Sequence, residues 1–414
     1  MQTLKEAKNS LYKAAMEYLN KNKQTTEIIP LLQAQNRILA CDIYAKRSLP
    51  NFDNSAMDGY AFNLKDAGKV LKIQASIFAG DCNDVILAPQ TCVKIMTGAK
   101  IPQGADCVAP FECIEGGFNN TTEITAPQTL EYFANIRKEG EEILKDSLLL
   151  ERGVQLTCDM LTLLASQGIS NVQVFSSLNI SIFASGNELR EPWEIANSAQ
   201  IYNSNATMVQ STLQSLYFKS KYCGILQDDF KAVNSALQTP SDVIFTTGGA
   251  SKGEADFIRQ ALKKNGATLL IDGVDVKPGK PIMVAHFQEK FIVALPGNPL
   301  AGNIMLRALI LPFLQQLSGA KAHYLNPITL KTKTPMKRKG RTEILLATIQ
   351  DDSVSFTKNG KYSSGEVTPM IQSNAFVILD SNITEIKQGA LLKVLPFYTH
   401  FSTKEQEHIN GSHA

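Results

Sequence analysis

Apolar residues near the N-terminus recur at helical spacing, at Leu4, Ala7, Leu11, Ala14, Ala15, Tyr18 and Leu19. Lysines stand between them, and this spacing predicts an amphipathic helix. No continuous apolar core of a signal peptide follows, so we expect a cytoplasmic protein. An extended segment over 28–32 and a helical stretch leading to Pro50 come next, and residues 151–164 show a helical pattern expected to pack on the first helix. We interpret 1–45 and 143–175 as one linking domain.

Between residues 46 and 142 the pattern changes to short β-like segments separated by Gly, Pro and Asn. The expected strands are Leu71–Ala75, Thr91–Met96, Cys107–Pro110 and Glu123–Ala126. We interpret 46–142 as a β-rich domain inserted into the linking domain.

Beyond Val172, strand patterns alternate with helical patterns. The expected strands are Ile180–Ala184, Tyr222–Leu226, Val243–Thr246 and Phe291–Leu295, and the expected helices are Ala206–Phe218, Phe230–Leu237, Asp256–Lys264 and Ala301–Leu317. This alternation predicts a parallel sheet covered by helices, a three-layer α/β domain over 176–320. Over 326–400, β-branched segments with turns at 358–361 and 387–389 predict a β-barrel-like C-terminal domain, and 401–414 is expected to be a polar tail.

The composition excludes several classes of protein. The 414 residues include 41 basic and 39 acidic side chains, a net charge of +2, which gives no support for nucleic-acid or membrane-surface binding. The apolar run Ile304–Leu317 is broken by Arg307 and Pro312 well short of the ~20 residues of a bilayer span, so we expect no transmembrane helix. The cysteines form no C-x-x-C pair and the histidines no H-E-x-x-H, which indicates reduced, buried thiols and no zinc site.

Three predicted strand-to-helix loops are rich in glycine and small hydroxyl residues: Ser185–Glu188, Thr246–Asp256 and Leu295–Pro299. In an open α/β sheet, ligands bind beyond the carboxyl ends of the strands, where such loops present backbone N–H groups. Any one of these loops is more typical of a tight turn. Three on one predicted sheet edge favour anion binding, because glycines admit a bulky anion and hydroxyls donate to its oxygens.

Carboxylates follow the same predicted strands, at Glu188, Asp228, Asp229 and Asp256. Clustered hard oxygen donors beside phosphates suit Mg²⁺, which bridges one or two carboxylates to a substrate. Two of these residues have an alternative interpretation. Asp229 can cap the helix that starts near Phe230, and Asp256 can lie in the first turn of a helix.

Two lysines, Lys277 and Lys280, lie in the segment Lys277-Pro278-Gly279-Lys280-Pro281. Its prolines keep this stretch out of a helix. A stiffened pair of ammonium groups suits a dianionic oxyanion. Two lysines in such a segment are more often simply solvated at the surface. Only the neighbouring glycine-rich loops make anion binding a comparable interpretation.

The segment Pro50–Tyr60 contains Asp53, Asn54, Asp58 and Gly59 within a few residues. An Asx-type turn explains part of this, because Asp and Asn readily bond their own backbone. A turn alone does not need so many polar residue types, so we expect a functional contribution as well.

Taken together, these motifs resemble one known family, the molybdopterin molybdenumtransferases of the MoeA type, which include the enzymatic C-terminal domain of gephyrin. The matching segments follow the family order and cover almost the whole chain. They are Pro50–Tyr60, Ile95–Ala99, Pro102, Gly104–Asp106, Gly140–Glu141, Glu188, Tyr202–Asn205, Thr246–Asp256, Lys277–Pro281 and Leu295–Pro299. Each is modest alone, and together they are highly specific.

The resemblance implies an elongated linking domain, an inserted β-rich domain, a central α/β domain related to molybdopterin adenylyltransferases, and a C-terminal β domain. It implies a reaction in which adenylylated molybdopterin and molybdate, with Mg²⁺, give molybdenum cofactor and AMP. It also implies a homodimer in which the loop of Asp58 faces the partner's central domain. The implied further partners are the molybdopterin adenylyltransferase and the recipient molybdoenzymes.

The resemblance also assigns roles to individual residues. The metal and the pyrophosphate linkage would be held by Glu188, Asp228 and Asp256. Molybdate would be held by Lys277, Lys280, Arg341 and either Ser363 or Ser364. The nucleotide and pterin phosphates would be held by loops containing Gly248, Gly249, Ser251, Pro296, Gly297 and Asn298. The remaining catalytic candidates are Asp58 and Thr97, from the second subunit, and Glu142.

Three positions depart from the family pattern. Glu142 stands where Asp usually follows Gly-Glu, which lengthens the reach of the carboxylate by one methylene. Asn187 and Asn203 stand where acids are common. The loss of charge at these two positions is expected to weaken metal binding.

Two other functions share some of these features. Molybdopterin adenylyl transfer needs only the central α/β unit, so the segments before Val172 and after Asn326 count against it. A non-catalytic scaffold that binds a partner peptide, as gephyrin also does, has no need of a charged cleft. Molybdenum insertion is therefore the function that the sequence favours.

Overall fold

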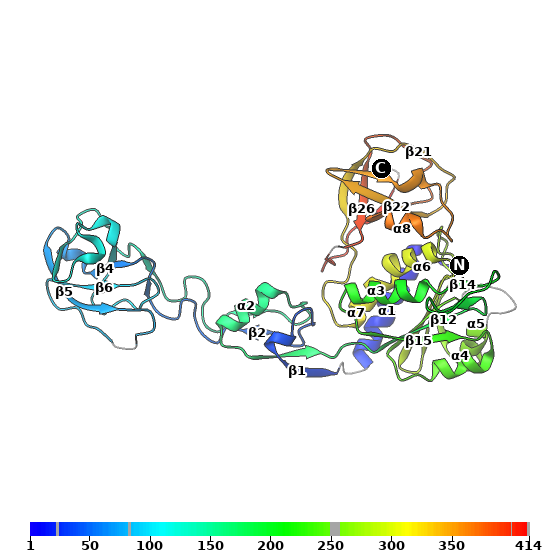
Figure 1. Cartoon of the computed structure of the whole chain (residues 1–414), viewed down its shortest axis with the longest axis horizontal. Coiled ribbons are helices and arrows are strands. Elements are labelled where there is room, and N and C mark those ends of the chain that lie inside the picture. The colour runs from blue at the N-terminus through cyan, green and yellow to red at the C-terminus, as the bar shows by residue number, and fades with distance from the viewer. Residues whose placement is uncertain (22–24, 82–83, 249–256, 399, 412–414) are drawn as a thin grey trace. The chain divides into compact units, whose positions relative to one another are not determined.

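The computed structural model describes residues 1–414 except 22–24, 82–83, 249–256, 399 and 412–414 (Figure 1). The chain forms two compact units. The larger unit comprises Met1–Cys41, Arg152–Leu161 and Ser170–Ala414, and the smaller unit comprises Asp42–Glu151 and Thr162–Ile169. The chain therefore crosses between the units at four places.

A six-stranded mixed sheet forms the centre of the larger unit, in the order β15-β12-β16-β19-β18-β17. The parallel strands are β15 (Ser220–Leu226), β12 (Ile180–Ser185), β16 (Val243–Thr247) and β19 (Lys290–Leu295). An antiparallel edge of β18 (Met283–Phe287) and β17 (Thr268–Asp272), which the sequence pattern did not predict, completes the sheet. The sheet expected to be parallel throughout is therefore parallel only in its first four strands.

Helices cover both faces of this sheet (Figure 1). Successive residues of a strand point to opposite faces, so Ile182 and Phe183 of β12 belong to two separate cores. One core contains residues of α1 (Leu4–Lys21), α3 (Asn205–Ser215), α6 (Pro299–Met305) and α7 (Leu311–Leu317). The other contains residues of α4 (Phe230–Leu237) and α5 (Phe257–Lys264). The predicted three-layer α/β architecture is confirmed.

The N-terminal helix α1 packs into the central core. It begins with a capping box, in which the Glu6 backbone N–H donates to Thr3 Oγ1 at 3.2 Å and the Thr3 N–H donates to the Glu6 carboxylate at 2.8 Å. Its buried stripe, Leu4, Ala7, Leu11 and Ala15, joins the core of the central sheet, and α1 contacts α7 and β17. The expected packing of α1 on residues 151–164 is therefore wrong, because its apolar stripe is buried against the sheet domain instead.

The linking segments after α1 and before β12 form short strands, turns and a short helix. β1 (Thr26–Pro30) pairs antiparallel with β11 (Asn171–Phe175). The helix expected before Pro50 is replaced by the 3₁₀ turn η1 (Leu31–Gln33) and the strand β2 (Ile43–Tyr44), which pairs with β10 (Leu148–Leu150). The helix expected over 151–164 is shorter and begins later, as α2 (Cys158–Ser166).

The segment Pro299–Leu317 is, among the described residues, long and apolar enough to cross a membrane by length and composition. A π-helical turn, Leu306–Ile310, joins α6 to α7 within it. Its most apolar window is 94% buried within the chain. This segment packs as a core helix of the central domain.

The C-terminal region closes into a five-stranded barrel. The strands β22 (Glu343–Gln350), β23 (Ser353–Phe356), β20 (Ile328–Thr332), β26 (Leu391–Pro396) and β24 (Ala375–Leu379) pair in that order, and β22 also pairs with β24. The barrel prediction is confirmed. Part of the expected polar tail is paired with the barrel, because β27 (Ile409–Asn410) adds to β24 and the Asn410 side chain donates to the Ile378 and Lys393 carbonyls at 3.0 and 3.1 Å.

The smaller unit contains a five-stranded sheet in the order β7-β4-β6-β5-β8. Four of its strands match predicted segments: β5 (Val70–Ile77), β6 (Thr91–Ile95), β7 (Cys107–Pro110) and β8 (Glu123–Thr125). The fifth, β4 (Gly59–Phe62), begins with the last two residues of the Pro50–Tyr60 motif and pairs with both β6 and β7. Part of that motif is therefore a core strand.

Candidate functional site

Three loops meet at the carboxyl edge of the parallel strands. Gly248, which follows β16, has a φ of 141°, and its N–H donates to the Leu295 carbonyl of β19 at 3.2 Å. A Cβ on Gly248 would lie 2.5 Å from the carbonyl oxygen of Ser185, at the end of β12. A Cβ on Gly297 would lie 3.9 Å from the Gly248 Cα. These loops are thus in contact, as the sequence predicts, and glycine at 248 permits the approach.

Three of the predicted residues in this region, Gly249, Ser251 and Asp256, lie outside the described residues. Their contacts are not described. The predicted roles of these three residues remain predictions that rest on the family resemblance.

Asp228 joins the loop after β15 to the loop after β12. The Ser185 hydroxyl donates to its Oδ1 at 3.0 Å, and the Asn187 backbone N–H donates to its Oδ2 at 3.3 Å. The Asp228 N–H in turn donates to Asn187 Oδ1 at 3.3 Å. Each carboxylate oxygen keeps a second acceptor site for a ligand. Asn187 thus ties two site loops together without adding a second negative charge beside Asp228.

Glu188 provides a second carboxylate at this edge. Its side chain is exposed, and a Cβ on Gly186, whose φ is 149°, would lie 2.7 Å from Glu188 Oε1. The carboxylate therefore lies close over the Gly186 backbone. The Glu188 carbonyl accepts from the Ile201 N–H at 3.0 Å, which anchors the loop through β13 (Leu189–Arg190) and β14 (Ile201–Tyr202).

The described donors suit a hard cation such as Mg²⁺. Asp228 and Glu188 supply carboxylate oxygens on neighbouring segments, which are the ligands that Mg²⁺ prefers. Within the described part of the chain, no group of three or more His, Cys, Asp or Glu side chains is placed to hold a metal ion. The third predicted ligand, Asp256, is outside that part.

The neighbouring Asp229 has a structural role. Its side chain accepts from the Ala232 N–H at 2.8 Å and caps the N-terminus of α4. The alternative interpretation of this residue, as a helix cap, is therefore confirmed.

A third group of predicted residues joins the central domain to the barrel. Asn298 Nδ2 donates to the Ser364 hydroxyl at 2.8 Å, and the Leu300 N–H donates to the Ser364 carbonyl at 3.2 Å. Ser363 is held from its backbone, whose N–H donates to Glu366 at 2.7 Å. The loop after β19 and the Ser363–Ser364 segment therefore belong to one site region.

The lysine pair lies on a turn fixed by a glycine. Gly279 has a φ of 113°, and a Cβ there would lie 2.4 Å from Met305 Cγ and Sδ in α6. Lys277 and Lys280 are both exposed. The Lys280 carbonyl accepts from the Val274 N–H at 3.0 Å, so the turn is also closed through its main chain.

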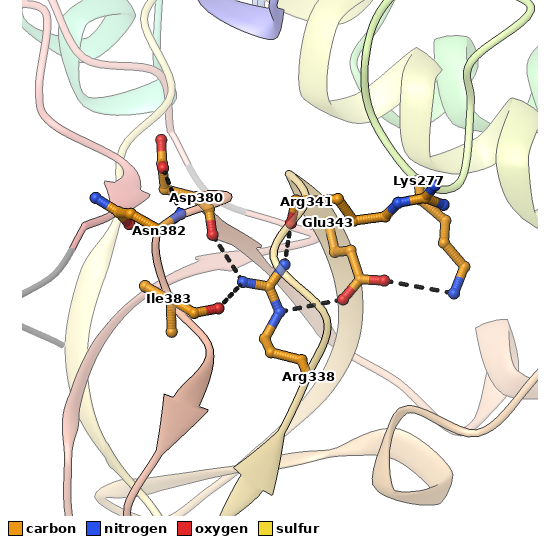
Figure 2. Close-up of polar contacts among 7 residues, drawn as sticks. All are labelled: Lys277, Arg338, Arg341, Glu343, Asp380, Asn382 and Ile383. Atoms are coloured by element: carbon orange, nitrogen blue, oxygen red, sulfur yellow. Dashed lines mark hydrogen bonds and ion pairs between the residues drawn. The ribbon is translucent and has the colours of Figure 1, made fainter.

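Lys277 is bound to the barrel segment that carries Arg341. Its N–H donates to the Thr342 carbonyl at 3.1 Å, and its carbonyl accepts from the Ile344 N–H at 2.9 Å. Its ammonium lies 3.4 Å from Glu343 Oε1 (Figure 2). The predicted molybdate residues Lys277 and Arg341 are thus brought onto adjoining segments.

The sequence pattern did not single out Arg338 or Glu343. The run Lys337-Arg338-Lys339 is typical of a solvated basic surface, but the Arg338 side chain is only 3% exposed. Its Nε donates to Glu343 Oε2 at 3.1 Å. Glu343 lies two residues after Arg341 in the chain, and its pairing with Arg338 follows from the fold of the barrel.

In the smaller unit, Asp58 and Thr97 lie together as predicted. The Thr97 N–H and hydroxyl donate to Asp58 Oδ1 at 2.6 and 2.7 Å. The backbone N–H of Thr97, followed by its hydroxyl, lowers the pKa of Asp58 below its usual value. Both residues are exposed, so this ionised carboxylate is available to a ligand.

Glu142 lies near the Pro50–Tyr60 motif in the same unit. Its carboxylate accepts from Arg137 Nη2 at 3.4 Å, while Arg137 Nε donates to Glu141 at 2.7 Å. Arg137 pairs with Asn54 through β9 (Ile136–Arg137) and β3 (Asn54–Ser55). Because Glu141 takes the shorter contact with Arg137, Glu142 is the less constrained of the two acids.

Comparisons with known proteins agree with this arrangement. The MoeA N-terminal region (domain I and II) matches residues 2–168, a probable molybdopterin binding domain matches 181–316, and the MoeA C-terminal region (domain IV) matches 329–397. A molybdopterin molybdenumtransferase of Haemophilus influenzae is 32% identical over 382 residues, covering 90% of this chain and 94% of that relative. The chain belongs to the molybdopterin molybdenumtransferase family.

Other members of the molybdopterin molybdenumtransferase family extend the match. The relative from Bacillus subtilis is 31% identical over 385 residues, or 89% of each chain. The crystal structure of a molybdopterin biosynthesis MoeA protein from Pyrococcus horikoshii is similar with a TM-score of 0.79 at 25% identity, covering 94% of this chain and 99% of that one. The resemblance inferred from the sequence motifs is confirmed.

Proposed function

We propose that this protein inserts molybdenum from molybdate into adenylylated molybdopterin, with release of AMP and with Mg²⁺ as the required cation. The observation that carries the proposal is the meeting of the Ser185, Gly248 and Gly297 loops beside the Asp228 carboxylate. The match of named molybdenumtransferases over about nine-tenths of the chain supports the same activity. It also disfavours simple molybdopterin adenylyl transfer, which needs only the central domain.

The chain's own groups support cleavage of the phosphoanhydride mainly by positioning. The loops at Gly248 and Gly297 bring main chain within reach of a bulky anionic substrate. The ammonium groups of Lys277 and Lys280 would hold molybdate with Arg341. Glu188, Asp228 and Asp256 would hold Mg²⁺, which when bound would neutralise charge on the pyrophosphate oxygens. Fixed groups of this kind stabilise charge without reorganising during the reaction.

A direct assay tests the activity. Purified protein supplied with adenylylated molybdopterin, molybdate and Mg²⁺ is expected to release AMP, measured by chromatography, only when molybdate is present. Lys280→Ala is expected to raise the molybdate KM roughly tenfold with an unchanged unfolding midpoint, because a charge that holds the anion is lost. Lys387→Ala, an exposed lysine on a barrel turn, is the control. AMP release without molybdate dependence, or adenylylation of molybdopterin by ATP, contradicts the proposal.

We further propose a cytoplasmic homodimer in which Asp58 acts on the central domain of the partner. This proposal rests on the family resemblance and on the exposed, ionised Asp58 carboxylate. Asp58→Asn and Asp228→Asn are each expected to be inactive alone but to restore roughly a quarter of the wild-type activity when co-expressed. Random pairing makes about half of the dimers mixed, and each mixed dimer contains one intact composite site out of two. No recovery in co-purified mixed dimers contradicts action across subunits.

A further inference from the structure

The buried side chain of Arg338 fixes the position of a carboxylate. Its guanidinium donates to the carbonyls of Asp380 and Ile383 at 2.7 and 2.5 Å, and also to the Arg341 carbonyl (Figure 2). Nε donates to Glu343 Oε2 at 3.1 Å. With the Arg338 side chain 3% exposed and that of Glu343 13% exposed, both groups are held within the barrel end.

The second oxygen of the fixed carboxylate faces the lysine. Glu343 Oε1 lies 3.4 Å from Lys277 Nζ, and the Lys277 side chain is 62% exposed. The Lys277 main chain is bound at both its N–H and its carbonyl, to Thr342 and Ile344. Lys277 is therefore held through its backbone and its ammonium by the same few barrel residues, while its outer side stays open to solvent.

The charges of this group favour an anion as the ligand. The Glu343 carboxylate is shared by Arg338 and Lys277, and Arg341 lies two residues away in the chain. These four side chains comprise three positive charges and one negative charge, so together they carry a net positive charge. An ammonium has three donor hydrogens, so contact with one carboxylate oxygen leaves others for a ligand. A flexible lysine that is already held in place loses less side-chain entropy when it binds.

We propose that Glu343, held by Arg338, is a positioning residue that orients the Lys277 ammonium for molybdate. The proposal rests on the proposed function, because it assigns Lys277 to the molybdate site. Glu343 touches the lysine and not the anion. Its contribution is to the affinity for molybdate rather than to bond cleavage.

Charge and positioning predict opposite results for Glu343→Gln. Removing a negative charge near an anion site strengthens anion binding by electrostatics alone. If Glu343 positions Lys277, its neutral isostere instead weakens molybdate binding, although the amide oxygen still accepts from Arg338. We expect the molybdate KM to rise roughly threefold to tenfold, with kcat at saturating molybdate almost unchanged.

The test measures molybdate-dependent AMP release by wild type, Glu343→Gln, Lys277→Ala and the double variant. In the Lys277→Ala background, Glu343→Gln is expected to cause no further rise in KM, since the lysine it acts through is gone. Asp352→Asn is the matched control, because Asp352 is an exposed carboxylate just beyond the other end of β22. Its KM is expected to equal that of wild type.

An unchanged or lower KM in Glu343→Gln overturns the proposal, as does an equal rise in the Lys277→Ala background. If Glu343→Gln does not fold, Glu343→Asp keeps the charge for Arg338 but shortens the reach to Lys277, and a wild-type KM in that variant also overturns it. If wild type releases no AMP, the proposed function fails separately. Equilibrium dialysis with molybdate alone then decides, with weaker binding to Glu343→Gln in support and equal or tighter binding against.

Discussion

Asp228→Asn is expected to lower kcat for molybdate-dependent AMP release by roughly a hundredfold or more, while the protein remains folded. The substitution removes the negative charge at the point where two site loops meet and keeps the side-chain shape. An amide at 228 can accept from the Asn187 N–H and donate to the Ser185 hydroxyl, so both contacts of the carboxylate have a replacement. The loss is therefore one of charge rather than of packing.

The adjacent residue supplies a matched control. Asp229→Asn makes the same chemical change, but Asp229 caps α4, and Asn caps helices about as well as Asp. Its activity is expected to stay close to that of wild type. Kinetics and urea unfolding of both variants check this pair. Full activity in Asp228→Asn would remove this residue from the catalytic machinery, and equal losses in the two variants would indicate damage to the loop.

The central domain was predictable from sequence because its strands are buried on both faces. β12 and β16 are buried along their whole length, which produces short apolar runs between helical patterns. The antiparallel strands β17 and β18 were missed, since no helix separates them and the alternation stops there. The packing partner of α1 could not be predicted either, because an apolar stripe indicates that a helix is buried but does not identify the element that covers it.

The candidate site was predictable to the extent that it lies at strand ends. Ser185, at the end of β12, lies close to Gly248 and Gly297, which follow β16 and β19, because these three parallel strands are neighbours in the sheet. The contacts of Arg338 with Glu343 could not be predicted, since a buried arginine and a solvated one look alike in a basic run. Asn187 was interpreted as a weakening departure, yet in the folded chain it ties Asp228 to the loop after β12.

The Pro50–Tyr60 motif contains a candidate catalytic residue, Asp58, followed by two residues that pack in the core, Gly59 and Tyr60. The packing of Gly59 and Tyr60 restricts the residue type more strictly. Tyr60 is fully buried and donates to the Gly117 carbonyl at 2.9 Å. Gly59 lies in β4 between two strands, where an added Cβ would lie 2.0 Å from the Ala109 carbonyl oxygen. No side chain can turn aside to relieve this overlap, because the obstructing atom belongs to the paired backbone of β7. Asp58 therefore directly precedes a strand whose first residue, Gly59, has no room for a side chain.

Gly59→Ala is accordingly expected to destabilise the smaller unit by roughly 3 kcal/mol or more, because β4 must separate from β7 to admit the methyl group. Hydrogen exchange followed by mass spectrometry locates the effect. The amides of residues 59–62 and 107–109 are expected to exchange on the order of a hundredfold faster, with those of the central sheet of the larger unit unchanged. Gly411→Ala, where a Cβ meets nothing within 4 Å, is expected to change neither unit. Unaltered protection in β4 and β7 of Gly59→Ala would show that the backbone yields, and that the glycine of this motif is kept for another reason.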